Sequence, residues 1–287
     1  MKIDISESPF ESAPVVPETF DENHVIRFRC HKGIECFNAC CSNIDITLTP
    51  YDILRLKNRL DLDSSEFLRR YTIPFEFGKN SIAGVKLQPV EGGTACQFMT
   101  EAGCSVYEDR PTACRYYPVG LLSLRRADEN FDRASYALVQ EDHCKGHFEA
   151  REISIKDYRK EQGLEEYDEL GRGWRRLVLK MKSAGPAIGA PSKKSLRFFF
   201  MACYDLDRFR EFVRSAGFQD TFELPAEELE RLYQDDVELL KFGERMILQV
   251  MFGEESIPRR ADALARREQR RREAEAIRAE LDDDNPA

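Results

Sequence analysis

Of the nine cysteines in this 287-residue chain, all but Cys203 lie between residues 30 and 144, in two groups of four. The first group comprises Cys30, Cys36, Cys40 and Cys41. The second comprises Cys96, Cys104, Cys114 and Cys144. Thiols concentrated in this way form disulfides or bind metal, and the redox state of the compartment decides between these uses.

The sequence predicts a reducing compartment. The N-terminal residues contain no apolar run typical of a signal peptide, and no stretch is long and apolar enough to cross a membrane. We therefore expect a cytoplasmic protein whose thiols stay reduced. An odd number of cysteines also disfavours a closed disulfide framework, so metal binding is the favoured interpretation. The alternative is a set of reduced structural or redox-sensing thiols.

Composition and patterning predict an α+β chain. We expect a small irregular cysteine-rich metal-binding domain with short hairpins and helices, followed by an all-helical C-terminal region. The net charge of −9 disfavours a general nucleic-acid-binding surface. The predicted parts are a flexible acidic arm over 1–24, a cysteine-cluster metal-binding domain over 25–150, a helical domain over 151–258, and a charged Arg/Glu helix or tail over 259–287.

Capping and turn residues locate elements around the cysteines. Thr49 and Pro50 predict the start of a helix that ends near residue 60. Segments 96–100 and 104–107 flank Glu101-Ala-Gly103 and predict a hairpin that brings two cysteines together. Pro111 and Pro118 bracket about two helical turns that carry Cys114.

The C-terminal half has the period of helices. We expect a helix over 164–183 that is interrupted at Gly171 and Gly173. Gly217 is expected to terminate a helix over 206–215, and Pro225 to begin one long helix that continues to about residue 252.

The predicted metal ligands are all eight clustered cysteines: Cys30, Cys36, Cys40, Cys41, Cys96, Cys104, Cys114 and Cys144. Adjacent side chains diverge on an extended backbone, so Cys40 and Cys41 are expected to bind different ions or to bind one polynuclear centre from two directions. Eight thiolates suit two tetrahedral zinc sites, one four-iron cluster with ligands to spare, or two clusters. Nearby histidines (His24, His31, His143 and His147) are further candidate ligands.

Other residues near the cysteines have two interpretations each. Arg29, Arg110 and Arg115 could offset the negative charge of the thiolates, or they could form ordinary ion pairs, with Glu108 or Asp109 as partners of Arg110. The many neighbouring aromatic residues could be a plain core or an apolar sheath that limits solvent around a redox centre. Cys203 follows an apolar run and is expected to be a buried, inert thiol.

These residues resemble the YkgJ-like cysteine-cluster family, whose members are described as zinc- or iron-chelating. The resemblance is carried by the first group, which ends in a vicinal pair, and by the phrase Gly103-Cys104-Ser-Val-Tyr107-Glu108-Asp-Arg110-Pro111-x-x-Cys114-Arg115-x-Tyr117-Pro118. It covers about residues 25–150 and implies the same eight cysteines as ligands. Members have been labelled iron–sulfur oxidoreductases, and a related cluster occurs in flagellin lysine N-methylases.

Three functions follow as hypotheses. The leading one is a cytosolic metal-binding protein that holds an iron–sulfur cluster or zinc, with iron–sulfur slightly favoured. The second is an iron–sulfur-dependent enzyme (an oxidoreductase or a lysine N-methylase-like group-transfer enzyme) with a pocket near Trp174 and Phe198–Phe200. The third is a zinc-stapled interaction module whose charged C-terminal helix recruits a protein partner. That helix could equally be a solvated helix without a partner.

Overall fold

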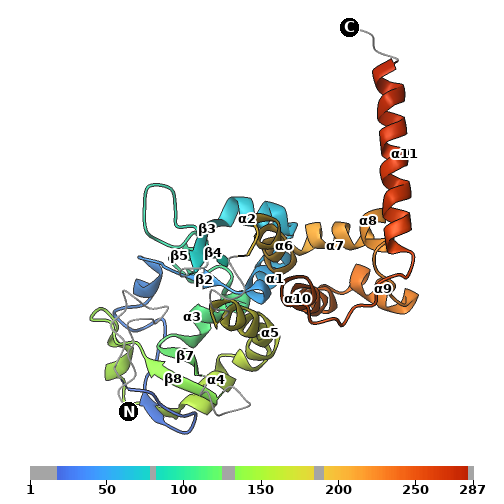
Figure 1. Cartoon of the computed structure of the whole chain (residues 1–287). Coiled ribbons are helices and arrows are strands. Elements are labelled where there is room, and N and C mark those ends of the chain that lie inside the picture. The colour runs from blue at the N-terminus through green and yellow to red at the C-terminus, as the bar shows by residue number, and fades with distance from the viewer. Residues whose placement is uncertain (1–17, 78–81, 125–132, 184–190, 284–287) are drawn as a thin grey trace. The chain divides into compact units, whose positions relative to one another are not determined.

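A computed structural model describes residues 18–77, 82–124, 133–183 and 191–283 of the chain (Figure 1). The chain divides into two compact units. The first comprises Met1–Leu62, Glu66–Glu76 and Gly84–Arg172, and the second comprises Asp63–Ser65, Phe77–Ala83 and Gly173–Ala287. The predicted α+β class, with an all-helical C-terminal region, is confirmed.

Short strands form small sheets around the cysteine segments. They are β1 (Val25–Arg27) with β9 (Glu152–Ser154), β2 (Thr47–Leu48) with β4 (Ile82–Leu87) and β3 (Thr72–Phe77), β5 (Met99–Thr100) with β6 (Gly103–Cys104), and β7 (Val119–Leu124) with β8 (Arg133–Leu138). The antiparallel β1–β9 pair places Val25 opposite Ser154 and so joins the two ends of the cysteine-rich segment. The β5–β6 pair is the predicted hairpin, and it places Met99 opposite Cys104.

The cysteine-rich part contains short helices and 3₁₀ turns between its strands. They are α1 (Pro50–Arg59), α2 (Ser64–Tyr71), α3 (Thr112–Tyr116), α4 (Ile155–Glu161) and α5 (Leu164–Ser183), with 3₁₀ turns η2 (Ala39–Cys41), η4 (Tyr107–Asp109) and η5 (Lys145–Phe148). Thr49 caps α1 as expected, and Asp52 completes a capping box by accepting a hydrogen bond from the Thr49 N–H. The predicted helix around Cys114 is α3.

Asp52 ties two helices together. Its carboxylate is fully buried and also accepts hydrogen bonds from the backbone N–H (2.8 Å) and the hydroxyl (2.7 Å) of Thr112. No side chain of its own caps the N-terminus of α3. Asp52 on α1 therefore supplies that cap and positions the helix that carries Cys114.

Part of the predicted N-terminal arm lies within the described residues. Phe20 exchanges backbone hydrogen bonds with Tyr136 on β8, and the carbonyl of Glu22 accepts from the N–H of Lys156. Residues 1–17 lie outside the described residues. Of the helices in the described part of the chain, none combines the length and apolar character that crossing a membrane requires.

The second unit consists mainly of helices: α6 (Lys193–Tyr204), α7 (Leu206–Arg214), α8 (Ala216–Gln219), α9 (Ala226–Gln234), α10 (Asp236–Phe252) and α11 (Ala263–Asp283). The single helix predicted from Pro225 to about residue 252 is wrong, because the chain breaks at Asp235, whose side chain caps α10. Gly217 does not terminate a helix as predicted; it lies within α8. Cys203 is buried on α6, as expected.

Helix α5 is continuous, so the interruption predicted at Gly171 and Gly173 is wrong. The absence of a side chain at Gly173 makes room for another residue, since a Cβ there would overlap the carboxylate of Glu244 on α10. Burial raises the pKa of Glu244 to about 7, although the backbone N–H of Trp174 and the charges of Arg176, Lys241 and Arg175 act in the opposite direction.

Replacing Asp52 with alanine should lower the free energy of unfolding by about 2–4 kcal/mol, because buried donors on two helices lose their acceptor. Urea denaturation monitored by circular dichroism measures this change. Asp45→Ala is the control, since Asp45 is exposed and its ion pair with Lys86 is at the surface. Equal losses in the two variants would contradict the assigned role of Asp52.

Glu244 should make the second unit more stable at mildly acidic pH. The pKa of Glu244 is raised in the folded protein, so folding favours the protonated carboxyl. The folded state is therefore most stable below the ordinary pKa of 4.5, and it loses stability as pH rises through about 7 and the buried carboxyl ionises. We expect the free energy of unfolding to fall by about 2–3 kcal/mol between pH 5 and pH 8 in the wild type, and this fall to be absent in Glu244→Gln. Urea denaturation across this range tests it, with Glu238→Gln on the same helix as the exposed control. An unchanged pH dependence in Glu244→Gln would refute the assignment.

Candidate metal centre

All nine cysteines are free thiols, and the eight clustered ones lie on segments that the fold brings together. Three of these, Cys30, Cys36 and Cys144, are here called the Cys36 set. The Arg29 N–H donates to the carbonyl of Gly146 (3.1 Å), and the Lys145 N–H donates to the Cys36 sulfur (3.1 Å). Residues more than a hundred positions apart in sequence thus meet around this set.

Three other cysteines, Cys96, Cys104 and Cys114, are here called the Cys104 set. Cys104 lies on β6 opposite Met99, and Cys96 comes three residues before Met99. The hairpin turn requires Gly103, whose φ is +117° and whose missing side chain leaves space for the ring of Phe37. Cys114 is carried by α3, which Asp52 holds at its N-terminus.

The vicinal pair, Cys40 and Cys41, is connected to the segment that carries Cys96 and Cys104. The Cys96 N–H donates to the carbonyl of Cys41 (2.8 Å), and the Asn38 side chain, just before η2, donates to the carbonyl of Thr100 (3.1 Å). The pair lies in η2 rather than in extended backbone, and its sulfur atoms are 4.0 Å apart. The premise that the two side chains diverge is therefore wrong.

The thiols act on one another's ionisation. Burial raises the pKa of Cys30 to about 11, with further contributions from Cys40, Cys36 and Cys144. The pKa of Cys40 is raised first by its hydrogen bond with Cys41, then by burial and by the charge of Cys144. Thiols with raised pKa values are protonated at neutral pH and make poor nucleophiles, so the cluster does not have the character of a reactive-cysteine site.

The same effect operates in the Cys104 set. Burial raises the pKa of each of its three thiols, and the charge of Cys40 adds to this at each one. Cys40 is therefore the thiol that interacts with both sets. A cation among these sulfurs would remove the repulsion and favour the thiolate forms.

Backbone N–H groups partly offset the rise in the thiol pKa values. Those of Phe98 and Met99 lower the pKa of Cys96, and that of Val106 lowers the pKa of Cys104. Together with the Lys145 N–H on Cys36, these donors place hydrogen bonds on sulfurs of both sets. Hydrogen bonds to sulfur are a standard means of stabilising metal-bound thiolates.

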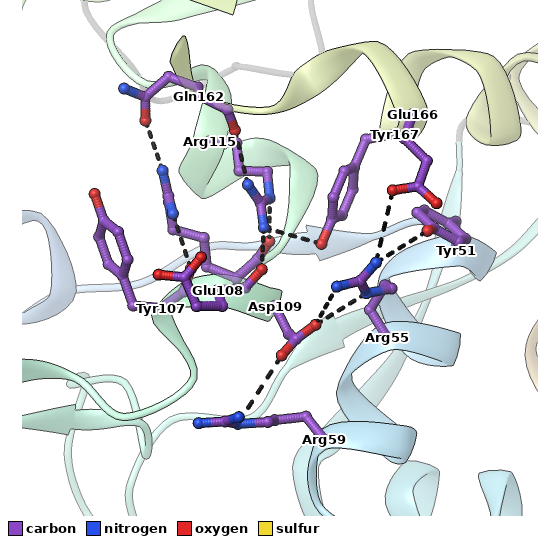
Figure 2. A network of polar contacts seen from close by, with 11 residues as sticks. Tyr51, Arg55, Arg59, Tyr107, Glu108, Asp109, Arg115, Gln162, Glu166 and Tyr167 are labelled. Carbon is purple, nitrogen blue, oxygen red and sulfur yellow. Dashed lines mark hydrogen bonds and ion pairs between the residues drawn. The ribbon is translucent and has the colours of Figure 1, made fainter. Parts of the chain in front are cut away.

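Arg115 holds the backbone next to the cysteines rather than a carboxylate. Figure 2 shows its guanidinium donating to the carbonyls of Gln162 (2.7 Å), Arg110 (3.1 Å) and Glu108, and to the hydroxyl of Tyr167 (3.1 Å). Its side chain is therefore a structural link between η4, α3 and the α4–α5 connection. Arg115 therefore does not form the ordinary ion pair that was one of its two interpretations.

Arg110 combines a structural and an electrostatic role. It stacks on the ring of Tyr107 (3.9 Å to the centroid) and donates to the Gln162 side chain (2.6 Å). Its charge also lowers the pKa values of Cys30 and Cys104, as expected of a cation near the thiolates. Asp109, which was expected as a partner of Arg110, instead pairs with Arg55 (2.6 Å).

Ring nitrogens of three candidate histidines already contact protein groups. His31 accepts a hydrogen bond from the Gly33 N–H through Nδ1 and lies 3.6 Å from Glu149 through Nε2. The Nε2 of His147 lies 3.1 Å from the carbonyl of Val139, and that of His143 lies 3.5 Å from Glu141. None of the three is placed with the cysteines as a ligand among the described residues.

As the side chains stand, no group of three or more His, Cys, Asp or Glu residues in the described part of the chain is arranged to hold a metal ion. The donor set nevertheless fits zinc or iron, since both prefer thiolates on irregular backbone. A further observation supports the fit. The buried hydroxyl of Tyr117 makes no hydrogen bond of normal geometry among the described residues, and burial raises its pKa together with hydrogen-bonding and charge interactions with Cys144 and Glu141. A thiolate at Cys144 would accept a hydrogen bond from this hydroxyl.

Residues 29–160 match the model of the CxxCxxCC family, which is described as a "putative zinc- or iron-chelating domain". The YkgJ-like resemblance is consistent with this family. No curated protein and no solved structure matches the chain.

Replacing Arg115 with lysine should lower the free energy of unfolding by about 2–3 kcal/mol, because an ammonium group cannot reach several carbonyls in the geometry of the guanidinium fork. Arg59→Lys is the matched control, since the Arg59 side chain is 50% exposed and makes a long ion pair with Asp109, with 3.9 Å between nitrogen and oxygen. Chemical denaturation of both variants distinguishes them. The role fails if Arg115→Lys is as stable as Arg59→Lys.

Proposed function

We propose that the domain over residues 25–150 binds zinc or an iron–sulfur centre through its eight clustered cysteines. The ligands are Cys30, Cys36, Cys40, Cys41, Cys96, Cys104, Cys114 and Cys144. The zinc- or iron-chelating family supports a metal as the cofactor. The preference for an iron–sulfur cluster stays a prediction from the sequence, as does the cytoplasmic location.

The observation that carries the proposal is convergence. Backbone hydrogen bonds connect the segments around Cys36, Cys96 and Cys144, although these lie far apart in sequence. The resulting thiols raise one another's pKa values, so they are protonated at neutral pH without a cation, and a bound cation would favour their thiolate forms.

The helical domain over 151–258 and the charged segment over 259–287 have no assigned chemistry. Trp174 and Phe199 are buried, and Trp174 donates to the hydroxyl of Tyr204 (3.1 Å), as core residues do. On α11, Arg270 pairs with Asp220 (3.0 Å) while Arg267 and Arg272 are exposed. A protein partner for this helix and an enzymatic use of the metal both stay predictions.

Protein purified without oxygen should contain zinc or iron at one or more equivalents per chain by elemental analysis. Cys114→Ala should lose a large part of this metal, because one of the proposed ligands is removed. Cys203→Ala should retain all of it, since Cys203 is buried on α6 in the second unit. A brown protein would indicate an iron–sulfur cluster, and a colourless one with stoichiometric zinc would exclude it. Less than one equivalent of either metal, with nine titratable thiols, would contradict the proposed function.

A further inference from the structure

Residues 29–47, here called the strap, differ from the rest of the cysteine-rich part in how little of them is buried. The structure describes all of these residues, and none of them is buried. By contrast, Phe28 just before the strap and Leu48 just after it are 3% and 0% exposed. The strap carries half of the proposed ligands, namely Cys30, Cys36, Cys40 and Cys41.

Both ends of the strap are fixed in the folded core. The ring of Phe28 packs at right angles to that of Tyr158, with 6.0 Å between the centroids, and a Cβ at Gly146 would lie 2.6 Å from the Phe28 ring. At the other end, Leu48 lies in β2 and pairs with Val85 on β4. The strap therefore begins and ends at well-packed residues.

Between its ends, the strap is connected to the rest of the chain mainly by hydrogen bonds at the surface. The Asn38 side chain donates to the carbonyl of Thr100 (3.1 Å), and the Thr94 hydroxyl donates to the carbonyl of Ser42 (2.9 Å), both in exposed positions. Backbone hydrogen bonds to residues 87–96 are made at Cys41, Ile44 and Ile46. Exposed hydrogen bonds contribute little net free energy, and segments with few buried contacts are the first to open locally.

Phe37 makes an apolar contact between the strap and the β5–β6 hairpin. A Cβ at Gly103, in the turn of that hairpin, would lie 3.3 Å from the Phe37 ring. Because Phe37 is only half-buried, this contact stabilises the strap less than a core aromatic residue would.

The segments that carry the other proposed ligands have buried anchors. Phe98 and Val106 lie on either side of Cys104 in sequence and are buried, as is Arg115, which follows Cys114. The fully buried carboxylate of Asp52 also holds the N-terminus of α3. These contacts are made within the protein and do not require a metal.

We infer that the strap closes when a metal binds and opens when the metal is removed, while the segments around Cys104 and Cys114 keep their conformation. This inference rests on the proposed function and specifies how the site takes up and releases its metal. Bonds between the metal and strap thiolates supply the free energy of ordering that the strap's own surface contacts provide only weakly. Because the strap opens between fixed ends, metal enters and leaves without unfolding of the core.

Hydrogen–deuterium exchange measured by mass spectrometry tests this inference on the full-length protein. One sample is purified without oxygen and keeps its metal, and the other is stripped with a chelator and a thiol reductant. We expect amides of the strap to exchange at least about tenfold faster in the stripped protein, while those of α1 and α3 change by less than about twofold.

Two results would overturn the inference in a protein shown by elemental analysis to have held metal. One is equal exchange of the strap with and without metal, and the other is a loss of protection in α1 and α3 as large as that in the strap. A protein that holds less than one equivalent of zinc or iron contradicts the proposed function itself, and the strap inference falls with it.

Phe37→Ala and Phe148→Ala form a matched pair of variants, because the Phe148 side chain is 77% exposed and Phe37 contacts the hairpin. Phe37→Ala should speed metal transfer to an added chelator about fivefold to tenfold, since the closed strap loses an apolar contact. Phe148→Ala should leave the rate unchanged. Equal rates in the two variants would contradict control of release by the strap. If Phe37→Ala lacks the wild-type circular dichroism spectrum, Thr94→Val, which removes the hydrogen bond to Ser42, takes its place.

Discussion

Bringing thiols together from segments that lie far apart in sequence is the constraint around which the cysteine-rich part of the chain is organised. Burial and neighbouring charges raise the pKa values of Cys30, Cys96, Cys104 and Cys114, and the hydrogen bond with Cys41 raises that of Cys40. At neutral pH these thiols are protonated, and a bound cation would favour their thiolate forms. Polar contacts between the cysteine segments act together with buried apolar residues such as Phe28, Phe98 and Val106.

Those contacts use charged groups as backbone anchors. Asp52 accepts hydrogen bonds at the starts of both α1 and α3, and Arg115 donates to carbonyls from η4 and the α4–α5 connection (Figure 2). Neither charge is paired with an opposite charge in these contacts. Hydrogen bonds of this kind to charged groups are stronger than neutral ones.

Local signals in the sequence identified much of the fold, because capping and turn residues act through neighbours. Thr49 and Pro50 predicted α1, and Gly103 predicted the β5–β6 hairpin. The role of Asp52 at α1 had a signal in the Thr49-x-x-Asp52 spacing, but its contact with Thr112 depends on tertiary structure. Tertiary structure also explains why α5 is uninterrupted, since Gly173 accommodates the carboxylate of Glu244 from α10.

At the candidate site, too, the sequence did not predict contacts that depend on tertiary structure. Cysteine spacing and the family resemblance predicted the eight ligands, but they could not indicate that the N–H of Lys145, next to Cys144, donates to the Cys36 sulfur, because that contact joins residues 109 positions apart. The conformation of the vicinal pair was also hidden, since it depends on the 3₁₀ turn that Asn38 begins with a φ of +67°. A left-handed residue at that point sets the conformation of the vicinal pair, and the order of cysteines along the chain does not contain this backbone geometry.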